Sequence, residues 1–342
     1  MSAAVFVSAD EVWLGGWRGA SLLRIDGNRL DWVAPLAAAT ERPTFHVPGT
    51  IFGGFTDSHV HLGLIDPDLL VAGGIARVVD LGGDPESIVA LRDRGRVDAS
   101  AVAIEFAGAF LTAPGGYPSD RSWAPRSSLR EVATPQQSGA AIGELRGLGA
   151  TRIKITLNSN AGPVWDDGML AAVVTQAHAV GLPVVAHAEG PGQAQRAARS
   201  GVDTLAHTPW TERLSDDDVA HLAATLAITS TLDIHGYGDY GADYATALDN
   251  LTRFVAAGGR VLYGTDLGNG PLPTGLNERE LVGLAAAGLD AAGIAAAVVP
   301  DVTSLDTRIS WIPNISTDPA ATASWFASST VLAVASLKEL FA

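Results

Sequence analysis

Two histidines stand two positions apart in the segment FTDSHVHLG, residues 55–63. Side chains at positions i and i+2 of a β-strand point to the same face of the sheet. The rings of His59 and His61 could therefore bind one metal ion. Pairs of this kind also arise by accident in polar loops, so this pair on its own decides nothing.

Four further residues that could bind or bridge metal ions lie within or at the ends of later apolar runs. The runs are TRIKITLN, LPVVAHAEG, VDTLAHT and RVLYGTD, and the residues are Lys154, His187, His207 and Asp266. Each has an ordinary explanation, such as a lysine that extends to solvent or a histidine buried in a core. Their recurrence at the same place in successive runs favours a common site.

Eight short apolar runs alternate with helix-like segments after residue 50. They are IFGGFTDSHVH, ARVVDLGG, AVAIEFAGAF, TRIKITLN, LPVVAHAEG, VDTLAHT, ATLAITSTLD and RVLYGTD. Several of the intervening segments end in glycine, which is typical of a helix C-terminus. Eight such units predict an α/β fold of the (β/α)8 TIM-barrel type, with a doubly wound open sheet as the alternative. The strands of a barrel end at one mouth, where these polar residues would meet.

The chain divides into three predicted parts. Residues 1–50 are rich in β-branched and aromatic residues and predict a small domain resembling a β-sandwich, with a hairpin turn at DGN. Residues 51–300 form the predicted (β/α)8 barrel. Residues 301–342 are a tail that could complete the β-rich domain. Within the tail, TRISWIPN could be a strand, and STVLAVASLKELFA a strand or a helix.

Composition limits the partners of the protein. The formal net charge is −15 over 342 residues, which argues against nucleic acid or an anionic membrane as a partner. The chain has no cysteine, which excludes disulfides and thiolate metal sites. Neither a signal peptide nor a long apolar span is evident, so we expect a cytoplasmic protein. We also expect it to form a homo-oligomer.

With these residues in this order, the sequence resembles the amidohydrolase superfamily of the binuclear-metal type. The matching motifs are DSHVH, IKI, AHAEG, AHT and GTD. Within the superfamily, VVAHAEGPGQAQRAARSGVDTLAHT and TAPGGYP resemble the imidazolonepropionase-like and prolidase-like branch. The resemblance covers about residues 45–290. The closing motif of most relatives, G-x-I-x-x-G-x-x-A-D, is absent from the tail.

The resemblance implies a centre of two divalent metal ions, zinc or manganese. His59, His61 and Asp266 would bind one ion, and His187 and His207 the other. A CO2-derived carbamate on Lys154, together with a hydroxide, would bridge the two. A lysine whose amine is neutral can form such a carbamate, and its anionic oxygens suit these metals.

The resemblance also implies hydrolysis of an amide, lactam or dipeptide-like C–N bond. The metal-bridging hydroxide would attack the carbonyl, and Asp266 would carry its proton to the leaving nitrogen. Asp57 is expected to orient the strand or a histidine and not to react. Hydrolysis of a lactone or an organophosphate ester, a mononuclear deaminase and a non-catalytic metal-binding barrel remain alternatives.

Aromatic residues in the loops after the strands predict a small, apolar or cyclic substrate. The expected substrate-binding residues are Tyr117, Trp210, His235 and Tyr237. Many relatives have histidine in place of Tyr117, which leaves the substrate open. Arg121 and Arg126 could bind a substrate carboxylate or could be surface charges.

Overall fold

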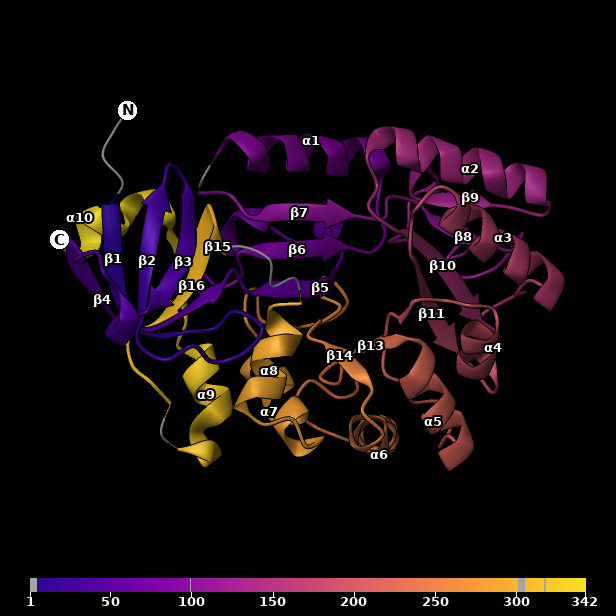
Figure 1. Ribbon diagram of the computed structural model, residues 1–342. Helices are drawn as coiled ribbons and strands as arrows, with labels where there is room; N and C mark the ends of the chain where they lie inside the picture. The colour runs from indigo at the N-terminus through magenta and orange to yellow at the C-terminus, as the bar shows by residue number, and fades with distance from the viewer. Residues whose placement is uncertain (1–4, 99, 301–304, 317) are drawn as a thin grey trace.

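The computed structural model describes residues 5–98, 100–300, 305–316 and 318–342. A mixed β-sheet stands beside a (β/α)8 barrel whose helices lie on the outside (Figure 1). The predicted barrel with a small β-rich domain is confirmed. Among the described residues, no helix is both long enough and apolar enough to span a membrane.

The β-rich domain is one seven-stranded sheet with the strand order β15-β3-β2-β1-β4-β16-β17. The strands are β1 (Val5–Val12), β2 (Ser21–Asp26), β3 (Arg29–Pro35), β4 (Phe45–Gly53), β15 (Leu305–Asp306), β16 (Arg308–Ile312) and β17 (Thr330–Ala333). β2 and β3 form the hairpin expected at DGN, with Asp26 opposite Arg29. Gly27 takes a φ of 60° in the two-residue turn, a conformation that favours glycine.

The C-terminal tail therefore supplies three strands to the sheet begun by the N-terminus. β16 pairs antiparallel with β4 and with β17. The tail also forms two short helices, α9 (Thr322–Ala327) and α10 (Leu337–Phe341). The segment STVLAVASLKELFA thus contains both a strand and a helix. Figure 1 shows β1, the first described strand, and α10, the last helix, in this one domain.

The barrel follows the predicted alternation of strands and helices. Its strands are β5 (Thr56–Val60), β6 (Arg77–Asp80), β7 (Ala103–Phe106), β8 (Phe110–Thr112), β10 (Ile153–Asn158), β11 (Val184–Glu189), β12 (Thr204–Leu205), β13 (Ala227–Thr229) and β14 (Arg260–Leu262). Its helices are α1 (Pro85–Val97), α2 (Pro135–Leu148), α3 (Asp167–Ala179), α4 (Gln193–Arg199), α5 (Asp216–Thr225), α6 (Ala242–Ala256), α7 (Glu278–Ala286) and α8 (Ala291–Val298).

The barrel closes between its first strand and the segment after its last. Ser58 donates a backbone hydrogen bond to Tyr263 at 2.9 Å, and Asp266 donates one to His59 at 2.8 Å. Val60 and Leu267 form a parallel bridge. These contacts hold the first histidine motif beside the loop that carries Asp266.

The third apolar run is interrupted and forms two strands, β7 and β8. The break contains Gly108, whose φ of 78° lies in the left-handed region and ends regular pairing. A short additional strand, β9 (Leu129–Glu131), pairs with β8. The break turns β8 so that Phe110 packs at 5.7 Å from the ring of His61.

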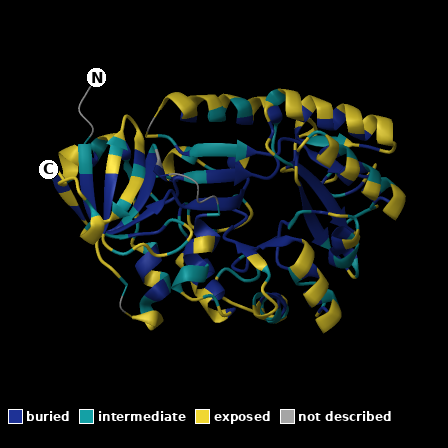
Figure 2. Ribbon diagram, viewed as in Figure 1, coloured by how far each residue is buried: buried dark blue, intermediate teal, exposed yellow. Residues whose placement is uncertain are grey.

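Burial divides the barrel into an apolar wall and an exposed outer ring. Most strand residues are buried, with β7 mainly intermediate, while the helices present exposed residues on their outer sides (Figure 2). A small apolar cluster fills the inside of the barrel and consists of Val79, Leu81, Ala107, Val185 and Ala206. Above this cluster, toward the strand C-termini, the interior becomes polar.

Candidate metal centre

The first histidine pair sits on an irregular strand. The register of β5 against β6 shifts between Asp57 and Val60. The His59 amide donates to the Asp57 carboxylate at 3.0 Å. Both imidazoles reach the polar interior, as the i, i+2 spacing predicts.

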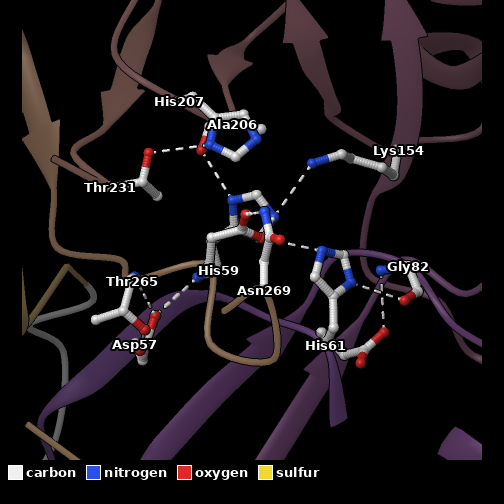
Figure 3. Close-up of polar contacts among 12 residues, drawn as sticks. Asp57, His59, His61, Gly82, Lys154, Ala206, His207, Thr231, Thr265 and Asn269 are labelled. Atoms are coloured by element: carbon white, nitrogen blue, oxygen red, sulfur yellow. Dashed lines mark hydrogen bonds and ion pairs between the residues drawn. The ribbon is translucent and has the colours of Figure 1, made fainter. Parts of the chain in front are cut away.

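Backbone carbonyls fix the orientation of both imidazoles. Nδ1 of His59 donates to the carbonyl of Ala206, and Nδ1 of His61 donates to that of Gly82, both at 2.9 Å. A carbonyl oxygen can only accept, so each Nδ1 carries the hydrogen. Each ring therefore turns its other nitrogen, Nε2, toward the centre (Figure 3).

Asp266 completes this group. Its Oδ1 lies 3.1 Å from Nε2 of His59 and 3.1 Å from Nε2 of His61. Its other oxygen accepts a hydrogen bond from the Asn269 amide at 2.8 Å. The backbone of Asp266 has a φ of 58°, so the residue is held in an uncommon conformation.

This arrangement fits a cation. Within the described part of the chain, Asp266 Oδ1 is buried and has no hydrogen-bond partner of its own. Two imidazole lone pairs and a carboxylate oxygen facing one another repel unless a proton or a metal ion lies between them. Atoms of His59, His207 and Asp266 that could bind a metal lie within 4.8 Å of one another.

Lys154, His187 and His207 lie on the other side of His59. Lys154 Nζ is 3.5 Å from His59 Nε2 (Figure 3). The ring of His207 lies 4.7 Å from that of His59 and 4.9 Å from that of His187. His207 Nδ1 bonds to the Thr231 hydroxyl at 3.0 Å. The structure thus brings together all six residues that the sequence analysis selected as metal ligands.

Burial and mutual charge shift the pKa values in this centre. Burial lowers the pKa of Lys154 to about 7, so its amine is available in the neutral form near neutral pH. Burial and the Lys154 charge hold the pKa of His59 well below its usual range. Burial opposes ionisation of Asp266, but the surrounding histidines, His59 foremost, hold its pKa well below its usual range.

Two buried aspartates hold the backbone that carries the ligands. Asp57 accepts from the amides of His59 and Thr265 and from the Thr265 hydroxyl, which ties β5 to the residue before Asp266. Asp80 accepts from the amides of Leu62 and Gly82. Within the described contacts, neither side chain reaches the centre directly. Asp57 therefore orients the strand, in line with its expected role.

A cavity of about 470 Å³ opens above the centre. Beyond the six candidate ligands, the residues that line it are mainly apolar or aromatic. They are Leu64, Phe110, Tyr117, Trp123, Glu189, Trp210, Ile234, Gly268, Asn269 and Gly270. Tyr117 stacks on His187 with ring centroids 5.0 Å apart, and Trp210 lies 5.5 Å from His207.

The remaining predicted substrate residues lie behind this lining. His235 packs against Trp210 at 4.9 Å, and the Tyr237 hydroxyl donates to the Asn269 carbonyl at 3.3 Å. Arg121 lies 5.7 Å from the Tyr117 ring, whereas Arg126 lines a separate surface groove beside α2.

Two residues of the site were not identified from the sequence. Glu189 lines the cavity and bonds through Oε2 to His187 Nε2 at 3.1 Å. Its i, i+2 spacing from His187 is the same signal that identified His59 and His61. Asn269 donates a hydrogen bond to Asp266. The only feature of the sequence that could have identified Asn269 is its position three residues after Asp266.

Comparison with known proteins identifies the fold. No protein-family model and no curated protein matches the sequence. The solved structures similar to it include an Xaa-Pro dipeptidase (TM-score 0.77, 18% identity, covering 97% of this chain and 98% of that one). A second is ochratoxinase of A. niger, with a TM-score of 0.75 and 15% identity, covering 97% of this chain and 94% of that one. A third is phenylurea hydrolase B, with a TM-score of 0.73 and 16% identity, covering 98% of each chain. At these identities the likeness establishes the fold.

Proposed function

We propose that this chain is a metal-dependent hydrolase of the amidohydrolase superfamily that cleaves an amide, lactam or dipeptide-like C–N bond. One observation carries the proposal. The Asp266 oxygen faces the lone pairs of His59 and His61 inside a buried cluster that also contains Lys154, His187 and His207. Such a set is suited to binding a metal ion, and it lies at the end of the barrel where enzymes of this architecture keep their active sites.

Two divalent ions, zinc or manganese, would occupy the centre. His59, His61 and Asp266 would hold one, His187 and His207 the other, and a carbamate on Lys154 would bridge them. When bound, these ions would lower the pKa of a water molecule and polarise the carbonyl of the substrate.

The residues of the chain supply proton transfer and substrate orientation. Asp266 would take the proton of the attacking water and donate it to the leaving nitrogen. Asn269 holds Asp266 through one oxygen and leaves the other facing the centre. Tyr117 and Trp210 flank the histidines and would bind an apolar or cyclic part of the substrate.

The names of similar structures support cleavage of a C–N bond. One is called a dipeptidase and another a phenylurea hydrolase. The same ligand set could also hydrolyse a lactone or an organophosphate ester, since both reactions attack a polarised electrophile. A substrate panel separates these possibilities. It should contain N-acyl amino acids, dipeptides, phenylureas, lactams, lactones and phosphotriesters.

Metal content tests the centre itself. We expect protein purified with bicarbonate to contain about two equivalents of zinc or manganese, measured by elemental analysis. The Lys154→Ala variant should lose most of this metal. Lys338→Ala is the matched control, because Lys338 is the only other lysine and lies in the short terminal helix α10.

Each other result selects a different function. One equivalent that survives the loss of Lys154 would favour a mononuclear deaminase, which ammonia release would detect. Metal without turnover of any substrate would favour a binding barrel. Metal near zero in both the unmodified protein and the variant would overturn the proposal.

A further inference from the structure

A second cavity, of about 850 Å³, lies at the N-terminal end of the barrel, opposite the metal centre. Among its described lining residues, five are arginines and two are acidic, Glu105 and Asp203. The chain as a whole has a net charge of −15. The local excess of positive charge therefore runs against the overall charge of the protein.

Three of these arginines occupy equivalent positions at the starts of barrel strands. Arg77 and Arg260 are the first residues of β6 and β14, and Arg152 directly precedes β10. Side chains two positions apart share a face of a strand, so Arg152 points to the same side as Lys154, into the barrel. By the same rule the side chain of Arg77 points to the same face as that of Val79, which packs inside the barrel.

These residues form one layer of the barrel interior. Alternate strands of a (β/α)8 barrel contribute the four side chains of a layer. The second, fourth, sixth and eighth strands of the barrel are β6, β10, β12 and β14. β6, β12 and β14 begin at Arg77, Thr204 and Arg260, and Arg152 directly precedes β10. All four of these residues line the cavity. Branched apolar residues usually fill such a layer. Here three guanidinium groups and a hydroxyl border an open volume.

The cavity's own carboxylates neutralise only part of this layer. Arg152 pairs with Glu105. Among the described residues, the Arg260 guanidinium donates a 3.3 Å hydrogen bond to the carbonyl of Pro300. Arg77 has no hydrogen-bond or ion-pair partner in the described parts of the chain. Burial, together with the Arg77 charge, lowers the pKa of the nearby Arg308.

We propose that this cavity binds a compact polyanion, a small molecule with carboxylate or phosphate groups, through Arg77, Arg152 and Arg260. A guanidinium group presents paired donors that match the oxygens of either group. The cavity is larger than the one above the metal centre, so it has room for a small metabolite. The site is separate from the proposed reaction and would be a second ligand site of the protein.

Calorimetric titration of the full-length, metal-loaded protein tests this site. The probes are tricarballylate, a tricarboxylate, and inorganic phosphate in separate titrations at low ionic strength. We expect saturable binding of at least one probe with about one site per chain, and a rise in Tm that sodium chloride of equal ionic strength does not produce. The probe that binds more tightly identifies carboxylate or phosphate as the recognised group.

Variants locate the binding. Arg77→Gln and Arg260→Gln should each weaken the affinity at least about tenfold, because each removes a charge-assisted contact. Arg24→Gln should bind like the unmodified protein, since Arg24 lies in the β-rich domain and pairs with Asp31. If Arg77→Gln does not fold, Arg260→Gln carries the test, because Arg260 is exposed.

Three results would overturn the proposal. They are the absence of saturable binding of both probes up to about 10 mM, unchanged affinity in a folded arginine variant, and a stabilisation that sodium chloride reproduces. Unchanged affinity in the arginine variants would place any bound phosphate elsewhere, for example at the metal centre.

Discussion

The proposed function gives Asp266 two tasks, metal binding and proton transfer. It lies close enough to His59 and His61 to share a metal ion with them, and it is the proposed carrier of the proton. Asn269 and the left-handed backbone hold it in one position. An acid that is already oriented can transfer a proton without first rearranging.

Replacing Asp266 by asparagine keeps its size and one oxygen but removes its ability to accept a proton. We expect kcat to fall by about 10²–10⁴ on an amide substrate. The fall should be smaller for an anilide with a good leaving group, whose nitrogen needs less protonation. Steady-state kinetics with metal content measured in parallel checks this. A kcat close to that of the unmodified protein would assign the proton transfer to another residue.

Carbamate formation on Lys154 should increase as the pH rises. Burial lowers its pKa to about 7, and only the neutral amine reacts with CO2. The metal-free protein should therefore carry more carbamate at pH 8 than at pH 6 at a fixed concentration of dissolved CO2. Carbon-13 NMR with labelled bicarbonate detects the carbamate, and Lys154→Ala provides the blank. Equal signals at both pH values would contradict the lowered pKa.

At the scale of elements, helix α7 holds the loop that follows β13. Glu280 in α7 accepts hydrogen bonds from the amides of Leu232 and Asp233 at 2.9 and 2.8 Å. Asp233 is also paired with Arg279 at 2.8 Å. This loop carries Ile234, which lines the cavity above the metal centre. The helix thus fixes one wall of the proposed substrate site.

Glu280 should make the attachment of this loop to α7 sensitive to pH. Burial raises its pKa to about 7, so the folded protein holds the proton more tightly than the unfolded chain does. The stability gained from protonation is fully present below the unfolded pKa of about 4.5 and is lost as the pH rises through about 7. The unmodified protein should therefore lose about 2 kcal/mol relative to Glu280→Gln between pH 5 and pH 8.

Urea unfolding of the unmodified protein and of Glu280→Gln at several pH values measures the difference in their free energies of unfolding. Groups that titrate equally in the two proteins cancel in this difference. Glu278→Gln is the matched control, since Glu278 lies exposed on the same helix. A constant difference between the unmodified protein and Glu280→Gln across this pH range would show that Glu280 does not titrate as proposed.

At the scale of the whole molecule, the tail joins the two parts of the fold. Phe326 in α9 is fully buried and lies 5.6 Å from the ring of Phe52 and 5.8 Å from that of Phe55. Phe55 directly precedes β5, and its amide donates to the Ser310 hydroxyl of β16. The tail therefore packs against the residue that leads into the histidine motif.

The Phe326→Ala variant should lower the free energy of unfolding by about 3–5 kcal/mol, because it leaves a cavity in this shared aromatic core. Denaturant unfolding measures the loss. Leu340→Ala is the control, because Leu340 is 55% exposed and its truncation should change stability little. A small effect of Phe326→Ala would mean that the barrel does not depend on the tail.

The sequence by itself predicted the barrel and the six candidate metal ligands. Alternation of buried strands with helices predicts the architecture, and parallel strands necessarily end at one mouth. His59, His61, Lys154, His187, His207 and Asp266 could therefore be grouped although they come from five different strand regions of the chain.

Only the tertiary structure decided the contacts between segments that carry no local pattern. The tail strands pair with β3 and β4, Glu280 holds the loop after β13, and Arg77 and Arg260 border one cavity. Each of these contacts joins residues far apart in the chain. Their partners are set by how whole elements pack, a property that periodicity within a single segment does not contain.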